Sequence, residues 1–391
     1  MSDWVGLLLK AVYYYGRIIG LGNFDIDWRK GRVFTALRSS LYVLAINVII
    51  LVVMFLQIFK RTDPNVVFEK ANALHQTLII VVVGIKLASG LCTVINRWRQ
   101  RAKFMRLARK MLQLSLEKPQ VKRMSRWGIL IKVVIAIVTD LLQMAISWDS
   151  ADRVDSNQFL GMIFQFWLSA IINLAISQHY LVTLFVRAYY NLLNTELRTV
   201  INESKMLSYF TVRRGVFMTR CCFLADKVDS IAKLQYRLQT IINQMNAVVG
   251  VQGLLVYAGY YIFSISTTYV TYSIHKNGIE NLQLTIKSVI LAFCWCFFYY
   301  LDATINLFIM INLLDDHKEM LRLLEERTLF APGLDARLEE SFESIQLQLV
   351  RNPFKIEVLK MFSITRSSTT AMFGSLITHS IFLIQCDMEY F

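Results

Sequence analysis

Long blocks of apolar residues alternate along the chain with segments rich in charged residues. Each block has about 20 residues, the length an α-helix needs to cross a hydrocarbon core of roughly 30 Å. The blocks lie at about residues 36–58, 74–96, 129–147, 160–186, 247–274, 288–310 and 367–386. The pattern predicts an all-α membrane protein with seven transmembrane helices, in a single domain covering residues 1–391.

The composition agrees with this prediction. Apolar residues make up 55% of the chain and charged residues 18%, whereas a typical soluble domain has about 25% charged residues. All four prolines lie between the blocks, so nothing in the sequence predicts a proline kink within a span. There is no internal repeat of the kind that marks many secondary transporters.

The loops differ in charge on alternate sides of the predicted spans. Of 42 Lys and Arg residues, 33 lie in the N-terminal segment and in loops 97–128, 187–246 and 311–366, and only five lie in the opposite loops and tail. Basic loops stay in the cytosol during membrane insertion. We therefore expect a cytosolic N-terminus and an extracellular C-terminus.

A seven-residue apolar repeat leads into the fifth block. Leu224, Ile231, Leu238 and Met245 recur at this spacing, and Gln235 is the polar exception among the companion positions. The repeat predicts one helix of about 50 residues that projects from the bilayer into the cytosol.

The cytosolic segments 187–246 and 311–366 are expected to contain anchor helices. Amphipathic patterns at 313–324 and 338–349 support this expectation. Such helices can lie on the membrane surface or pack together as a bundle. The repeat that continues directly into the fifth span favours the bundle.

No group of residues matches a catalytic or metal-binding pattern. Cys294 and Cys296 fall on different faces of a helix, which is poor geometry for one metal ion. The sequence predicts that the protein is not an enzyme and uses no cofactor. The net charge of +14 lies in loops without a nucleic-acid-binding motif, so we expect no nucleic-acid partner.

Four ionisable residues lie within the predicted spans, where charges are costly and often functional. Lys86 and Lys132 are near enough to the cytosolic ends for their side chains to reach the membrane surface. Asp140 and Asp302 lie deeper, so each either lines a water-filled cavity or pairs with a neighbouring helix.

The outer halves of the spans are rich in aromatic and amide side chains, which suit a pocket for an amphipathic small molecule. An interfacial aromatic belt is the alternative explanation. The candidate ligand-binding residues are Gln76, Gln143, Trp148, Gln165, Trp167, Tyr261, Ser264, Thr268, Tyr272 and Trp295.

The end of the last span resembles a known motif. Insect gustatory receptors have Thr-Tyr, five apolar residues and then Gln-Phe at this place. This sequence keeps Thr378, the spacing and Gln385, and has His379 and Cys386 in place of the tyrosine and phenylalanine. With the chain length, the inverted topology and the segment from Phe342 to Gln385, the whole chain resembles this family. It is most similar to the divergent receptors for bitter compounds.

The resemblance implies a ligand-gated, nonselective cation channel in the plasma membrane of gustatory receptor neurons, on their dendrites. The family is similar to odorant receptors in assembling as tetramers around a pore lined by the seventh span. The implied partners are a small-molecule tastant, the lipid bilayer and further identical or related subunits. Gln385 and Thr378 match pore residues of the family, and the changes at His379 and Cys386 affect pore width and ion selectivity.

One side of the last span has small and polar residues, namely Thr370, Gly374, Thr378 and Gln385. Such a side suits a pore, although small residues also pack helices together. Four Gln385 amides would present carbonyl dipoles to a cation. Asp387 and Glu389, just outside, are expected to raise the local cation concentration.

Seven spans also occur in receptors that signal through cytosolic proteins. The predicted orientation is opposite to that of G-protein-coupled receptors, and the last span has no Asn-Pro-x-x-Tyr motif. A seven-helix receptor that acts through its basic loops is therefore kept as the alternative function.

Overall fold

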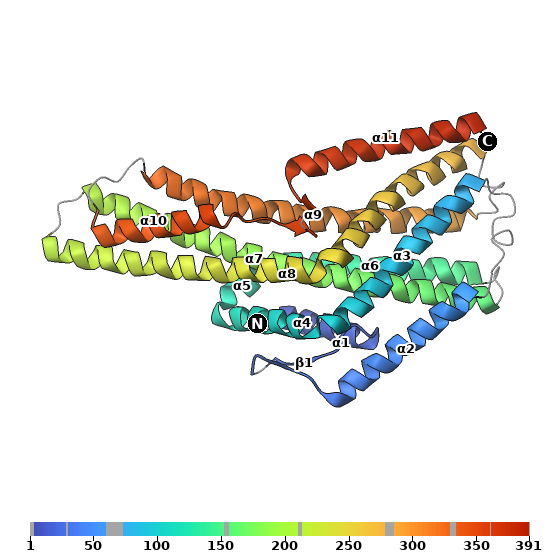
Figure 1. The fold of residues 1–391 in the computed structure, drawn as a ribbon, viewed down its shortest axis with the longest axis horizontal. Coiled ribbons are helices and arrows are strands. Elements are labelled where there is room, and N and C mark those ends of the chain that lie inside the picture. Colours follow the sequence, from blue (N-terminus) through green and yellow to red (C-terminus); the bar gives the residue numbers. More distant parts are fainter. Residues whose placement is uncertain are drawn as a thin grey trace.

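The computed structural model describes residues 4–28, 30–59, 73–151, 156–209, 213–277, 285–328, 334–359 and 361–390. Within these ranges it consists of eleven helices and four very short strands (Figure 1). Seven helices are long and apolar enough to cross a membrane. They are α2 (Leu37–Phe59), α3 (Ala73–Arg99), α6 (Arg126–Ala151), α7 (Ser156–Tyr209), α8 (Arg214–Asn277), α9 (Ile286–Thr328) and α11 (Arg366–Tyr390). The prediction of an all-α, seven-span fold is confirmed.

Three of these helices are much longer than a bilayer is thick. α7 has 54 residues, α8 has 64 and α9 has 43, so each extends well beyond a roughly 30 Å hydrocarbon core. Their extensions lie alongside α10 (Ala336–Arg351) at the left end of the view in Figure 1. We call these four packed segments the helical anchor.

The apolar repeat of α8 forms the core of the helical anchor. Leu224, Leu238 and Ile242 are completely buried, and Ile231 and Met245 are almost so. They pack with buried residues of α7, α9 and α10. Of the two arrangements that the sequence allowed, the structure contains the bundle.

Gln235, the polar exception in the repeat, is also completely buried. Its amide nitrogen donates to the Tyr190 hydroxyl (3.3 Å) and to the Gln239 amide oxygen (3.1 Å). Its own amide oxygen accepts a hydrogen bond from Gln348 (2.7 Å). This glutamine therefore links α7, α8 and α10 through a satisfied polar network.

Several short elements surround the transmembrane bundle, and the sequence analysis predicted none of them. α1 (Trp4–Ile18) packs against α6 and α7, and α4 (Arg101–Glu117) and α5 (Pro119–Met124) follow α3. Two antiparallel hairpins complete the fold, β1 (Asp25–Asp27) with β2 (Arg32–Phe34) and β3 (Glu357–Val358) with β4 (Phe362–Ser363). Gly31, in the first hairpin turn, has a φ of +63°, which favours glycine.

α11 stands apart from the other helices and packs chiefly on α8 (Figure 1). At its first residue, Arg366 forms an ion pair with Asp315 of α9 (2.6 Å). The backbone amide of Ile364 donates to the carbonyl of Ile356 (2.9 Å), which closes the β3–β4 hairpin beneath the helix. The start of α11 is thereby fixed to the helical anchor, while most of its length has few neighbours within the chain.

Candidate ligand-binding site

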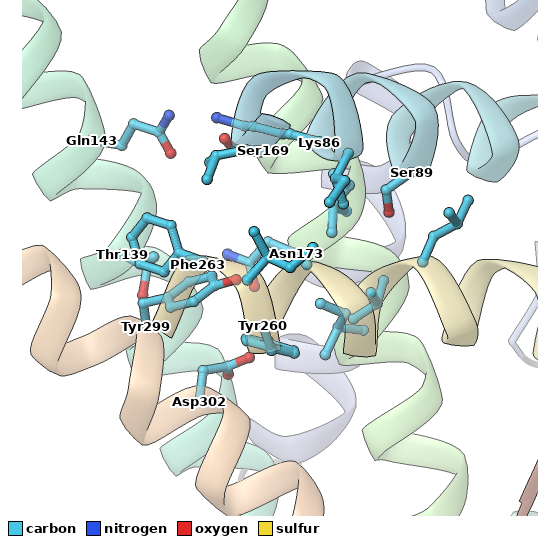
Figure 2. Close-up of a pocket in the computed structure, with 18 of the residues that line it drawn as sticks. Lys86, Ser89, Thr139, Gln143, Ser169, Asn173, Tyr260, Phe263, Tyr299 and Asp302 are labelled. Carbon is cyan, nitrogen blue, oxygen red and sulfur yellow. The ribbon is translucent and has the colours of Figure 1, made fainter. Parts of the chain in front are cut away.

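A cavity of about 160 Å³, here called the central cavity, lies between α3, α6, α7, α8 and α9. Figure 2 shows side chains from these helices converging on it. Most of its wall is apolar or aromatic. The polar side chains in the wall are Lys86, Ser89, Thr139, Asp140, Gln143, Ser169, Asn173, Tyr260, Tyr299 and Asp302. An apolar cavity with a few polar groups is the usual form of a small-molecule site.

Helical periodicity brings these side chains together. On α9, Trp295, Tyr299 and Asp302 follow at i, i+4 and i+7, so they share the face turned toward the cavity. On α8, Tyr260 and Phe263 are three residues apart, so both lie on the face turned toward the central cavity.

An aromatic cluster forms one wall of the central cavity. Trp295 stacks on Tyr299 with ring centroids 5.2 Å apart, and Phe263 meets the Trp295 ring edge-on at 5.4 Å. The indole nitrogen of Trp295 is buried and has no hydrogen-bond partner among the described residues. The wall therefore offers flat apolar surface with one unused donor, which fits an aromatic molecule that has a hydrogen-bond acceptor.

Asp302 forms a buried ion pair with Lys132 of α6. Asn306, one turn further along α9, donates to the second carboxylate oxygen of Asp302 (3.1 Å). The prediction that the Lys132 side chain reaches the membrane surface is wrong, because it is only 1% exposed and Asp302 supplies the opposite charge inside the bundle.

Asp140 is held by hydrogen bonds from two other helices. The Tyr15 hydroxyl of α1 donates to one carboxylate oxygen (2.7 Å), and the Asn173 amide of α7 donates to the other (3.0 Å). Asp140 and Asp302 both line the central cavity, and both have partners on neighbouring helices, so the pairing alternative applies to each.

Lys86 contributes an ammonium group to the central cavity. Its side chain extends toward Ser169 and Gln143 in Figure 2. Among the described residues, none forms a hydrogen bond or ion pair with this ammonium group. It lies in the cavity wall instead of extending to the membrane surface as predicted, so it is available to a bound acceptor.

The candidate ligand-binding residues fall into several groups. Gln143 and Trp295 line the central cavity. Tyr261, Ser264 and Thr268 line a second cavity, described next.

Trp148, Gln165, Trp167 and Tyr272 line neither of these cavities. Trp167 donates to the Ile19 carbonyl (2.9 Å), and Trp148 is 79% exposed. Gln165 and Tyr272 are partly buried, and the side chain of Gln76 lies outside the described part of the structure.

The second cavity, of about 640 Å³, lies beneath α11 and is bounded by α8 and α9. Met372, Phe373 and Leu376 of α11 form its cover. Val256 and Tyr260 of α8 line both this cavity and the central one, so the two spaces share a wall.

Polar contacts join α11 to α8 above this cavity. The Tyr261 hydroxyl lies 2.7 Å from the Ser375 hydroxyl and 2.9 Å from the Nδ1 of His379. His379, at the motif's tyrosine position, therefore takes part in holding the helix.

Near the end of α11, Asp387 forms an ion pair with Lys276 (3.0 Å) and accepts a hydrogen bond from Tyr269 (2.8 Å). The expectation that Asp387 attracts cations at the outer end is wrong, because its side chain is buried and Lys276 neutralises it.

The candidate pore residues lie on the uncovered side of α11. Gly374, Thr378 and Gln385 are exposed in the single chain, and Cys386 is partly buried. The Thr378 hydroxyl bonds to the Gly374 carbonyl of its own helix (3.1 Å), so it is satisfied without a neighbour.

The sequence analysis misplaced Lys86 and missed Tyr15, which holds Asp140, as well as several residues of the cavity wall, among them Thr139, Asn173, Tyr260, Phe263 and Tyr299. Tyr15 belongs to α1, for which no element was predicted. The apolar spacing of Trp4, Leu8 and Leu9, which pack against the core, was the available signal.

The seven candidate spans and the cavities between them are the features of a polytopic membrane protein, and no group of three or more metal-ligating side chains occurs among the described residues. A family model described as 7tm Chemosensory receptor matches residues 9–390, and the chain belongs to this family.

Proteins with similar sequences and a solved structure with a similar fold agree with this family assignment. Two gustatory receptors of Drosophila melanogaster, 36a and 36c, are 61% and 50% identical to this chain over the whole length of both. The structure of the insect olfactory receptor OR5 from Machilis hrabei matches with a TM-score of 0.63, covering 98% of this chain and 100% of that one at 11% identity. A second structure of OR5, in complex with eugenol, matches equally well. The resemblance to gustatory receptors is confirmed, and the protein is a chemosensory receptor and not an enzyme.

Proposed function

We propose that this chain is a subunit of a taste-receptor channel, which opens a nonselective cation pore when a bitter or aversive compound binds in the central cavity. The observation on which this rests is the arrangement around α8. This helix lines the central cavity with Tyr260 and holds α11 with the next residue, Tyr261. A ligand that displaces Tyr260 therefore acts on the segment that positions the candidate pore helix.

The distribution of basic residues among the loops favours a cytosolic N-terminus and an extracellular C-terminus. In this orientation the helical anchor lies in the cytosol. The receptor then belongs in the plasma membrane of gustatory receptor neurons, on their dendrites.

Four copies, identical or related, are proposed to surround the pore. Much of α11 is uncovered within one chain, and its exposed side has Gly374, Thr378 and Gln385. Polar side chains are costly against lipid, so other subunits and a water-filled pore are the environment that suits this side. A ring of Gln385 amides offers carbonyl dipoles to cations.

The central cavity favours an aromatic, amphipathic ligand. Its aromatic wall stacks a flat ring, and the Trp295 indole nitrogen and Lys86 ammonium both donate to an acceptor on the ligand. For such binding to open the pore, the ligand must bind the open state more tightly than the closed state.

Patch-clamp recording from cells that express the chain, alone and with related receptors, tests this function. We expect ligand-evoked cation current whose selectivity or block changes in Gln385→Ala. Leu383→Val is the control, because two residues along a helix place its side chain on nearly the opposite side. Unaltered conductance, block and selectivity in Gln385→Ala would remove this residue from the pore.

The alternative, a receptor that signals through cytosolic partners, predicts ligand responses without unitary current. A glycosylation sequon placed after Cys386 separates the orientations. Modification supports the extracellular tail, and an unmodified tail supports the alternative.

A further inference from the structure

A third cavity, of about 240 Å³, lies at the junction of α1, the β1 strand, α3, α4, α7 and α8. It lies at the end of the α3 span opposite the loop that follows α2, since the span ends at Arg99. Arg97 is therefore at the depth where lipid head groups meet the hydrocarbon core. We call this space the Arg97 cavity.

Arg97 is the feature that sets this cavity apart. The residue is 95% buried. Its guanidinium donates to the Gln178 amide oxygen and lies over the Phe104 ring, 3.9 Å from the centroid. Among the described residues, no carboxylate lies within ion-pair distance of it, and the described wall of the cavity contains no Asp or Glu.

An arginine cannot relieve this situation by losing its proton, because guanidinium stays charged in proteins. A buried charge without a counter-ion is strongly unfavourable. Inside the bundle Lys132 is paired with Asp302, whereas Lys86 has no partner among the described residues but lines the central cavity. The described part of the chain supplies no counter-ion for Arg97, so a bound anion would complete the site.

The rest of the wall indicates what kind of anion fits. The side chains around Arg97 are mostly apolar, among them Leu107, Met111, Val182 and Phe185. The buried indole nitrogen of Trp28 also lines the cavity and has no hydrogen-bond partner among the described residues. The cavity thus combines one fixed cation, one unused donor and an apolar lining.

We propose that the Arg97 cavity binds an anionic lipid, with the carboxylate or phosphate on the Arg97 guanidinium and the Trp28 indole and the first part of an acyl chain along the apolar wall. Basic pockets between transmembrane helices bind acidic lipid head groups in this way. The volume is below the roughly 300–1,000 Å³ of a drug-sized site, so the remainder of the chain extends beyond the cavity.

The position of the Arg97 cavity gives the lipid a regulatory role. Ala175, His179, Val249 and Gln252 line both this cavity and the one beneath α11. A lipid at Arg97 therefore contacts the same side chains that border the space under the candidate pore helix.

Binding to the purified full-length chain in phosphatidylcholine nanodiscs tests the proposal without reference to channel activity. The probes are oleate, phosphatidate and, as a neutral match, methyl oleate. We expect saturable binding of oleate, phosphatidate or both, none of methyl oleate, and affinity lowered at least tenfold in Arg97→Gln. Arg99→Gln, an exposed arginine on the same helix, should bind like the wild type.

Which anionic probe binds identifies the source, with oleate indicating a fatty acid and phosphatidate a phospholipid. Ala108→Phe fills the cavity and leaves Arg97 in place, so it should abolish binding even where Arg97→Gln folds poorly. Absence of saturable binding, equal binding of methyl oleate, or wild-type affinity in both cavity variants would overturn the proposal. Lipid binding without ligand-evoked current would leave this site standing and overturn the channel function alone.

Discussion

Lys132 of α6 and Asp302 of α9 form an ion pair inside the transmembrane bundle, although 170 residues separate them in the sequence. The pair borders the central cavity through Asp302, and Asn306 donates to the same carboxylate. It fixes the relative position of two adjacent helices that both contribute to the cavity wall.

Breaking this pair on one side should destabilise the protein strongly. In Asp302→Leu the Lys132 ammonium remains buried without a counter-ion, and loss of one partner of a buried pair costs about 3–5 kcal/mol. The double variant Lys132→Met/Asp302→Leu removes both charges and should recover most of the stability. Thermal unfolding of the purified protein in detergent measures both. A double variant no more stable than Asp302→Leu would show that the pair is not the main contribution of these residues.

Tyr15→Phe should destabilise the protein by roughly 1 kcal/mol, because it removes a donor from the partly buried Asp140 carboxylate. The hydrogen bond is 2.7 Å long and connects α1 to α6. Tyr14 is the matched control, since it is 55% exposed in the same run of tyrosines. Thermal unfolding of Tyr14→Phe should match the wild type; equal losses in the two variants would contradict the assigned role.

Gln235→Leu should lower stability even though it completes the apolar repeat of α8. Leucine removes the donor to the Tyr190 hydroxyl and to the buried Gln239 amide oxygen, and leaves the Gln348 amide with the Ala232 carbonyl alone. Each unsatisfied buried group costs about 1–3 kcal/mol, which exceeds the gain from one more apolar side chain when the site is already packed. Chemical denaturation followed by circular dichroism measures this, with Tyr236→Leu, an exposed neighbour, as control. A variant more stable than the wild type would contradict the network's contribution.

The spans could be predicted because hydropathy along one chain is a local property. The same holds for the heptad of Leu224, Ile231 and Leu238, which marks the buried face of α8 without knowledge of its neighbours. Family membership also followed from local residues at the end of the chain.

The contacts within the site could not be predicted in the same way. The sequence identified Lys132, Asp140 and Asp302 as charges that are costly within a span. Whether Lys132 reaches the membrane surface or pairs with a carboxylate depends on which helices lie side by side, and this is not a local property of the sequence. Tyr15 illustrates the limit, because its partner Asp140 is 125 residues away. For Asp387 the error is in the other direction. Its position near a helix end suggested an exposed charge, but its side chain is buried and forms an ion pair with Lys276.

Tyr261→Phe tests how the central cavity is connected to α11. The Tyr261 hydroxyl bonds to Ser375 and His379, whereas its ring and backbone are kept in phenylalanine. Under the proposed function, the variant should reduce the maximal ligand-evoked current, because α8 then moves with less effect on α11. Each lost hydrogen bond is worth about 1 kcal/mol, so the open-to-closed ratio at saturating ligand should fall about fivefold or more. Ligand affinity, measured by binding to purified protein, should fall by no more than the open-to-closed ratio does, because Tyr261 does not line the central cavity.

The exposed Tyr236 of the helical anchor provides the control substitution Tyr236→Phe, which should leave both quantities unchanged. A Tyr261→Phe channel with wild-type maximal current would place the connection elsewhere, at the shared residues Val256 and Tyr260. An affinity that falls further than the open-to-closed ratio would instead mean that Tyr261 shapes the ligand site, since coupling to channel opening can weaken binding by no more than that ratio changes.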